Sequence, residues 1–322
     1  MKKALVVGIN NYPYAPLYGC VNDAADFSKL IQRNGDHSAN FNVLLQTDVP
    51  SRSKLRELLH DLFSGQNETA LFYFSGHGYI NELGGFLVTP DQKRYDEGIS
   101  MNDILTLANQ SRSTNKIIIL DCCHGGAITT PELSAYGIGH INEGTTILTA
   151  CKQDEVAIEV RGRGVFTNLL LEALKGGAAD LNGHITPGSI YAYIDQALGP
   201  WDQRPVFKTN ISRFAALRSV PPKIASHILK NITRYFPEPG TEHLLDPSYE
   251  YTNNPDIVHT YKEPYAQEDK IAIFKELQKM HSAGLVEPVG EEHLYWAAMN
   301  GRACRLTSLG AHYWRLVQEK RI

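Results

Sequence analysis

The stretch Lys116-Ile-Ile-Ile-Leu-Asp121-Cys122-Cys123-His124-Gly125-Gly126 decides the fold. Its four consecutive apolar residues lie between polar neighbours and predict a strand buried on both faces of a sheet. The strand ends in two cysteines and two glycines. Open α/β sheets bind their ligands at the carboxyl ends of their strands. The stretch therefore predicts a sheet covered on both faces, with a thiol where a substrate can reach it.

Five further segments have the length and apolar character of strands, and helical patterns separate most of them. These strands are expected over residues 4–8, 42–46, 70–74, 145–150 and 205–209. Leucines on one face predict a helix over 51–63, and Thr186-Pro187 predicts the start of another, because proline suits the first helical turn. Strands alternating with helices predict an α/β fold with a mostly parallel six-stranded sheet sandwiched by helices.

The character of the sequence changes after Pro221-Pro222. We assign residues 1–218 to the α/β domain, and the proline-rich segment 219–266 to an extended connector. Residues 267–322 predict a helix, a hairpin of 286–289 with 295–304, and a last helix capped by Thr307-Ser308. This order is typical of a small winged-helix-like α+β domain.

Composition limits the classes of partner and of cellular compartment. The net charge of −4 gives no reason to expect nucleic acid or an anionic membrane as a partner. Residues 221–322 hold 12 basic and 13 acidic residues, a difference of −1, whereas a DNA-binding winged helix would have a basic face. Five irregularly spaced cysteines favour neither structural zinc nor a disulfide framework. With no signal peptide or membrane span in the sequence, we expect a cytoplasmic protein with a protein-binding C-terminal domain.

His77 and Cys123 follow two different strands, and together they predict thiol chemistry. A nearby imidazole can take the proton of a thiol, and backbone N–H groups can stabilise the oxyanion that forms on attack. Gly78 and the glycines after Cys123 would let the backbone approach closely. Taken singly, each residue has a simpler interpretation: a histidine in a turn, and a cysteine that packs as a small hydrophobic residue.

These two motifs also resemble the catalytic signatures of a known family. Phe74-Ser-Gly-His77-Gly78 and Asp121-Cys-Cys123-His124-Gly125-Gly126 are similar to those of caspase-like cysteine peptidases, and within them of metacaspases and their bacterial relatives, the orthocaspases. The resemblance covers residues 2–215 and implies the caspase-hemoglobinase fold. It implies that Cys123 is the nucleophile, that His77 is the base, and that the amides of Gly78 and Cys123 bind the oxyanion. Metacaspases usually have serine where Gly125 stands.

The resemblance further implies a substrate pocket. The matching positions are Cys20, Asp23, Ser75 and Asp121. In metacaspases this pocket is acidic and takes arginine or lysine, and two carboxylates would bind such a cation through charge-assisted hydrogen bonds. Asp23 could instead interact with a helix dipole, and Asp121 could be an ordinary residue at a strand end.

Calcium is the one cofactor that the resemblance raises. Many metacaspases bind calcium through aspartates outside the active site, and Asp91, Asp103 and Asp96 fall in the corresponding region. Exposed aspartates in a loop are usually only solvated. No other cofactor is expected.

The sequence thus predicts a cysteine endopeptidase that cuts proteins after arginine or lysine. By family analogy it would act in regulated bacterial cell death or antiviral defence. Two other classes stay open: a catalytically silent interaction scaffold with a caspase-like fold, and a transcription regulator built on the winged helix.

Overall fold

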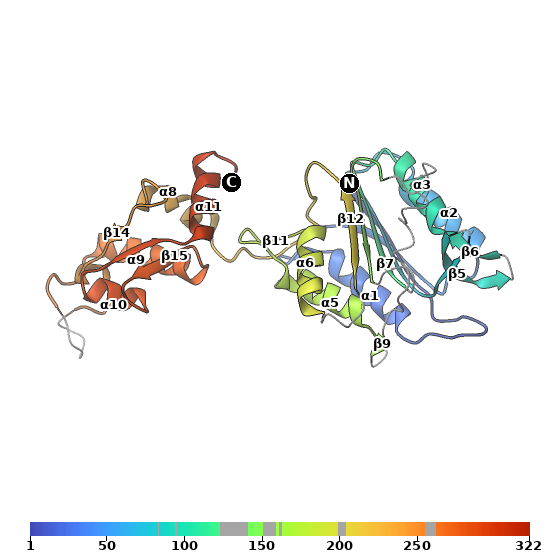
Figure 1. The fold of residues 1–322 in the computed structure, drawn as a ribbon, viewed down its shortest axis with the longest axis horizontal. Coiled ribbons are helices and arrows are strands. Elements are labelled where there is room, and N and C mark those ends of the chain that lie inside the picture. The colour runs from blue at the N-terminus through green and yellow to red at the C-terminus, as the bar shows by residue number, and fades with distance from the viewer. Residues whose placement is uncertain are drawn as a thin grey trace. The chain divides into compact units, whose positions relative to one another are not determined.

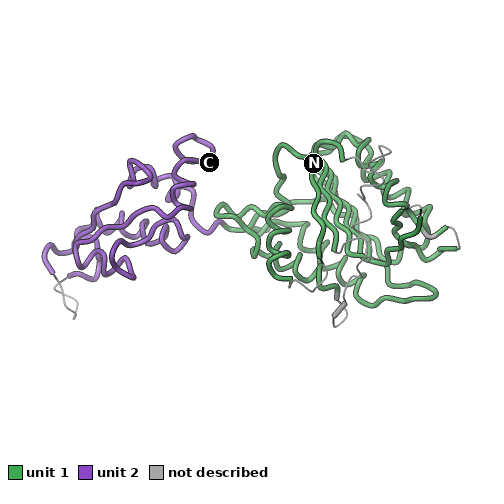
Figure 2. Tube along the Cα trace, viewed as in Figure 1, with its two compact units in different colours: residues 1–221 green, residues 222–322 purple. Residues whose placement is uncertain are grey.

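The structure is a computed structural model that describes residues 1–82, 84–93, 96–122, 141–150, 159–160, 163–198, 204–254 and 262–322. The chain forms two compact units, Met1–Pro221 and Pro222–Ile322 (Figure 2). No helix in these described ranges is long and apolar enough to cross a lipid bilayer.

Six strands form the central sheet of unit 1 in the order β12-β8-β7-β3-β1-β2 (Figure 1). Neighbouring strands run parallel, except that β12 pairs antiparallel with β8. Their bounds are β1 Lys2–Gly8, β2 Asn42–Thr47, β3 Thr69–Ser75, β7 Asn115–Asp121, β8 Thr145–Thr149 and β12 Val206–Asn210. The mostly parallel six-stranded sheet is confirmed, and the apolar run before Asp121 forms β7 near its centre.

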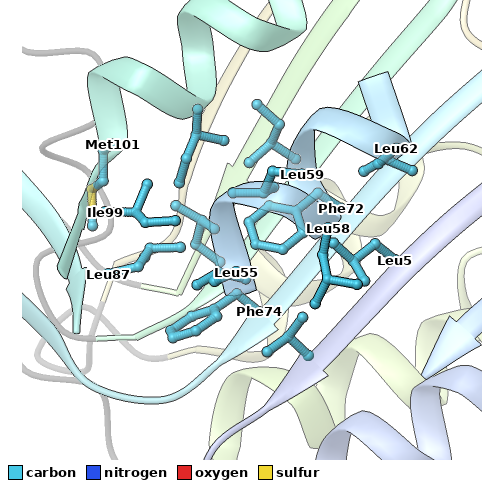
Figure 3. Packing of buried hydrophobic residues seen from close by; sticks show 14 of the residues in the cluster. Leu5, Leu55, Leu58, Leu59, Leu62, Phe72, Phe74, Leu87, Ile99 and Met101 are labelled. Carbon is cyan, nitrogen blue, oxygen red and sulfur yellow. The ribbon is translucent and has the colours of Figure 1, made fainter. Parts of the chain in front are cut away.

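Helices cover both faces of the sheet: α1, α5 and α6 lie on one side, and α2 and α3 on the other (Figure 1). Successive residues of a strand point to opposite faces. Leu71 and Tyr73 of β3 therefore belong to the core cluster with α1, α5 and α6. Phe72 and Phe74 belong to the cluster with α2 and α3 (Figure 3). The helices are α1 Cys20–Ile31, α2 Arg52–Phe63, α3 Met101–Gln110, α5 Val165–Glu172 with the π-helical segment η2 Ala173–Gly177, and α6 Pro187–Ala197. The Thr186 side chain caps α6 by accepting from the Ser189 N–H at 3.2 Å.

Smaller sheets complete unit 1. A three-stranded antiparallel sheet follows β3 directly, with β4 Gly78–Asn81, β5 Gly84–Lys93 and β6 Asp96–Ser100. Two short antiparallel pairs join β9 Glu159–Val160 to β10 Arg163–Gly164 and β11 His184–Ile185 to β13 Arg218–Ser219.

Short helices and a strand lie within residues 222–254, so the extended connector expected over 219–266 is wrong in this described part. The elements α7 Ser226–Lys230, α8 Ile232–Tyr235, β14 His243–Leu244 and the 3-10 turn η3 Pro247–Tyr249 lie within it. Pro247 opens η3, in the first-turn position that tolerates proline. The buried Asn253 amide donates to the carbonyls of Pro247, Lys262 and Pro264 and thereby holds this irregular segment together.

The rest of unit 2 differs from the expected hairpin. Strand β15 Val286–Val289 pairs antiparallel with β16 Ala303–Leu306, and β14 pairs with β16 as well. The strand expected over 295–304 is wrong in its first half, where α10 Leu294–Met299 buries Leu294, Ala297 and Ala298 at helical spacing. The remaining helices are α9 Glu268–Ser282 and α11 Ser308–Gln318. The winged-helix assignment therefore stays a prediction.

Candidate active site

The carboxyl ends of β1, β3 and β7 meet at one edge of the central sheet. Gly8 is in register with Ser75, and Ser75 is in register with Asp121. The Gly76 N–H donates to the Asp121 carbonyl at 3.3 Å, which ties the two motif-bearing strand ends together. Cys123 and residues 124–126 are outside the described residues. The role of Cys123 as nucleophile stays a prediction.

A backbone carbonyl orients the imidazole of His77. This half-buried side chain follows β3, and its Nε2 lies 2.7 Å from the Ala15 carbonyl oxygen. A carbonyl oxygen can only accept a hydrogen bond, so Nε2 must carry the proton. In the neutral ring the lone pair is then on Nδ1. His77 is therefore held in the tautomer that can act as a base through Nδ1.

Tyr12 contacts both the backbone and the ring of the same histidine. Its hydroxyl accepts from the His77 backbone N–H at 3.1 Å and donates to the Val88 carbonyl at 3.3 Å. The two rings are 4.5 Å apart between centroids and tilted by 58°. Burial raises the pKa of Tyr12 far above its ordinary value, so the phenol keeps its proton. A Cβ at Gly76 would lie 2.5 Å from this hydroxyl, which explains the glycine before His77.

The close packing of α1 on β1 places Cys20 and Asp23 at this sheet edge. A Cβ at Gly8 would lie 2.3 Å from the Cys20 carbonyl oxygen and 2.7 Å from Cβ of Ala24. The first turn of α1 can therefore lie directly on the end of β1. Cys20 is half-buried there, and Asp23 is only 1% exposed.

The carboxylates of Asp23 and Asp121 converge on Gly164. Asp23 Oδ2 accepts from the Gly164 N–H at 2.9 Å, and Asp121 Oδ2 accepts from the Thr167 hydroxyl at 2.6 Å. A Cβ on Gly164 would lie 3.2 Å from Asp23 Oδ2 and 2.5 Å from Asp121 Oδ2. Helix α1, strand β7 and the start of α5 thus bring two buried acidic groups to one point.

A buried tyrosine extends this network. The Tyr73 hydroxyl lies 2.6 Å from Oγ1 of Thr167. Because the Thr167 hydroxyl donates its hydrogen to Asp121, its oxygen accepts from Tyr73. Burial, followed by the charges of Asp121 and Asp23, raises the pKa of Tyr73 well above its ordinary value. The acidic pair is therefore poorly screened by solvent, and the electrostatics of this point favour a cation.

The structure brings together residues that the motifs named and others that they did not. Asp23 and Asp121 meet, Ser75 lies in register with Asp121, and Cys20 precedes Asp23 on α1. Sequence reasoning missed the contacts of four residues: Tyr12, Ala15, Gly164 and Thr167. Gly164 ends the glycine-rich run Arg161-Gly-Arg-Gly164, but nothing in that run shows that it meets two aspartates.

The region suggested for calcium holds carboxylates that are already bound by other groups. Asp91 accepts from the Arg52 backbone N–H and from the Thr89 hydroxyl, and Asp103 pairs with Arg56 at 2.5 Å. Arg52 also pairs with Asp96. The described residues contain no group of three or more histidine, cysteine or acidic side chains placed to hold a metal ion. Calcium binding by these aspartates stays a prediction.

Comparison with known proteins agrees with this geometry. Residues 1–214 match the model of the caspase domain. The chain belongs to the caspase-domain family. It is 33% identical to metacaspase-1 of Meyerozyma guilliermondii over 108 residues, which are 30% of this chain and 25% of that protein. The chain therefore spans only a quarter of the length of this curated relative.

Two solved structures share the fold at low sequence identity. Protein GSU0716 of Geobacter sulfurreducens has a TM-score of 0.51 and 17% identity, over 69% of this chain and 98% of that one. Caspase-1 of Spodoptera frugiperda has a TM-score of 0.51 and 12% identity, over 68% of this chain and 90% of that one. The caspase-like fold is thus established for unit 1, and its motifs resemble those of metacaspases. Membership of the family supports cysteine peptidase chemistry.

Proposed function

We propose that this protein is a cysteine endopeptidase that cuts protein substrates after arginine or lysine. The Cys123 sulfur attacks the peptide carbonyl while Nδ1 of His77 takes the thiol proton. The amides of Gly78 and Cys123 stabilise the oxyanion, and His77 returns the proton to the leaving amine. Water then hydrolyses the thioester, again with His77 as base. The bond between His77 Nε2 and the Ala15 carbonyl supports this role, because it leaves Nδ1 unprotonated.

One observation carries the basic specificity: Asp23 and Asp121 converge on a single buried point beside Gly164. A guanidinium or ammonium group can make charge-assisted hydrogen bonds to both carboxylates, and such bonds are strongest where water is excluded. An acidic substrate side chain would be repelled by the same pair.

Fluorogenic peptides ending in arginine, lysine, aspartate or leucine test this proposal. We expect cleavage after arginine and lysine only, and none by Cys123→Ala. Asp23→Asn or Asp121→Asn should lower kcat/KM for the arginine peptide by roughly 10- to 100-fold, the size expected when one charged hydrogen bond is lost. Asp61→Asn, which removes a charge from an exposed side chain, is the matched control.

A preference for aspartate would contradict the acidic pocket. Absence of turnover with every peptide, together with a Cys123 that iodoacetamide does not alkylate, would instead support a silent scaffold. Self-processing gives a further check, because residues 122–151 contain no lysine or arginine. An enzyme with basic specificity leaves this segment intact, and mass spectrometry of concentrated protein would reveal a cut there.

Unit 2 is not needed for the peptidase fold, and we assign it to binding a protein partner or substrate. Its nearly balanced charge supports a protein rather than nucleic acid as the ligand. The place of the enzyme in regulated cell death or antiviral defence rests on the family resemblance.

A further inference from the structure

A cavity in unit 1 is lined by basic residues that the proposed peptidase chemistry does not use. It has a volume of about 610 Å³, within the range of small-molecule sites. Its cations come from three places in the chain: Lys29 of α1 and Arg33 just beyond it, Lys175 of η2, and Arg218 of β13. Asp26 is the only acidic residue in its lining. This concentration of positive charge occurs in a chain whose net charge is −4.

The cations of this cavity have no acidic partners within ion-pair distance in the part of the chain that the structure describes. Arg218 donates from Nε to the Arg33 carbonyl at 2.9 Å and from Nη1 to the Leu174 carbonyl at 2.7 Å. Arg33 donates from Nη1 to the His37 carbonyl at 2.8 Å. These bonds fix the two guanidinium groups in place without neutralising their charge. Partial burial lowers the pKa of Arg218, as expected for a cation that lacks a counter-charge.

Backbone contacts make the wall of the cavity rigid. The Gly35 N–H donates to the Ser219 carbonyl at 2.7 Å, and the Ser219 N–H donates to the Asn34 side chain at 3.0 Å. The segment after α1 is thereby tied to β13, which carries Arg218. Lys29 and Lys175 are exposed at the rim, whereas Leu30 and Leu171 give the lining an apolar part.

We propose that this cavity binds a small anion carrying two or more linked phosphate groups. A single phosphate would fill only a small part of about 610 Å³, whereas a di- or triphosphate can contact cations on both walls. The shared chemistry is the phosphate chain, and its source is either an inorganic polyphosphate or a nucleoside polyphosphate whose base packs on Leu30 and Leu171.

The cavity is separate from the acidic pair. Asp23 and Lys29 are on the same helix, six positions apart, which corresponds to a rise of roughly 9 Å. Thr167 and Lys175 are similarly set apart along α5 and η2. A ligand here would therefore be distinct from the peptide substrate, and the proposal does not depend on the proposed peptidase activity.

Isothermal titration of the full-length protein with sodium triphosphate, in 150 mM salt without divalent ions, tests the proposal. We expect saturable binding of triphosphate. The double variant Arg33→Glu/Lys175→Glu should raise the dissociation constant by roughly tenfold or more. Lys93→Glu/Arg112→Glu makes the same change of net charge at exposed residues elsewhere on unit 1, and we expect it to keep the affinity. Because a double reversal could perturb folding, Arg33→Gln/Lys175→Gln is titrated as well, and its thermal unfolding is compared with that of the parent.

A parallel titration with ATP distinguishes the two sources. Tighter binding of ATP than of triphosphate indicates a nucleoside polyphosphate, and equal affinities indicate that only the phosphate chain is recognised. The proposal is overturned if the parent does not bind triphosphate, if the cavity variants bind as tightly as the parent, or if the control variant loses as much affinity as they do.

Discussion

Two hydrogen bonds hold His77: its Nε2–H donates to the Ala15 carbonyl, and its backbone N–H donates to the Tyr12 hydroxyl. The first selects the protonated nitrogen, and the second fixes the turn that carries the ring. Neither partner touches the peptide in the proposed mechanism. Ala15 and Tyr12 contribute to the catalytic rate by positioning the imidazole of His77. A displacement of about 1 Å at a reacting group can lower the rate roughly 100-fold.

Tyr12→Phe is therefore expected to lower kcat for an arginine peptide by roughly ten- to 100-fold while changing KM little. The variant leaves the His77 N–H and the Val88 carbonyl without their partner, so the free energy of unfolding should fall by about 1–3 kcal/mol. Steady-state kinetics and urea unfolding measure the two effects. Tyr18→Phe, at a side chain that is 72% exposed in the same loop, should change neither. An unchanged kcat in Tyr12→Phe would contradict the positioning role.

Thr167 is expected to act through Asp121 rather than through His77. Thr167→Val keeps the shape of the side chain but removes the donor to Asp121 Oδ2 and the acceptor for Tyr73. We expect a higher KM for arginine peptides with a smaller change in kcat, and a loss of about 1–3 kcal/mol in the free energy of unfolding.

Thr167→Ser keeps the hydroxyl and should restore KM, which separates the hydrogen bond from packing. Thr209→Val removes a hydroxyl that contacts Thr146 at the exposed end of β12 and serves as a control. A normal KM in Thr167→Val would show that Asp121 does not need this donor.

At the residue scale, the sequence identifies groups whose chemistry is local to a motif. His77 and Asp121 stand out because each directly follows or ends a buried strand. Tyr12 and Thr167 do not, because each acts through a partner at least 46 residues away. Only the strand order of the sheet brings such pairs together.

At the scale of elements, the contact between β1 and α1 sets the position of Asp23. Gly8→Ala places a methyl group 2.3 Å from the Cys20 carbonyl oxygen and 2.7 Å from Cβ of Ala24. The helix or the strand end must shift, and overpacking of this kind costs about 1–3 kcal/mol or more. Thermal unfolding and KM for the arginine peptide should both show the effect.

The control for Gly8→Ala is Gly240→Ala, where an added Cβ has no atom within 4 Å. We expect the control to leave the midpoint of unfolding nearly unchanged. If Gly8→Ala also unfolds at the parental temperature with a parental KM, α1 does not depend on this close approach.

The helices and strands of unit 1 were predictable because their sequences combine a strong apolar pattern with residues that typically begin or end such elements. Unit 2 was harder to predict, because short irregular segments there are stabilised by tertiary hydrogen bonds. Asn253 is an example: its amide joins three backbone carbonyls of a segment that proline content alone would mark as extended. The segment 295–304 was misassigned because a short apolar run fits a helix and a strand equally well until burial decides.

At the scale of the whole molecule, each unit buries tyrosine or cysteine side chains whose pKa burial raises, so these groups stay neutral. In unit 2, burial raises the pKa of Cys304 from 9.0 to about 12. Burial and the hydrogen bond to Glu276 raise the pKa of Tyr235 from 10.0 to about 12. Both groups are neutral when protonated, so the folded unit keeps protons that the unfolded chain releases above pH 9 to 10.

Cys304 and Tyr235 therefore each add a contribution to the free energy of unfolding of unit 2. We expect this contribution to be constant below about pH 9 and to fall as the pH rises toward 12. Urea unfolding at pH 8, 9, 10 and 11, followed by tryptophan fluorescence, measures the slope, since Trp296 and Trp314 both lie in unit 2. The hydrogen bond to Asp246 raises the pKa of Lys270, so loss of this proton lowers stability over an overlapping range. Tyr235→Phe isolates one contribution, because it removes the phenol proton and should make the decline less steep. An identical slope in the parent and in Tyr235→Phe would mean that Tyr235 titrates alike in both states, contrary to the buried hydrogen bond with Glu276.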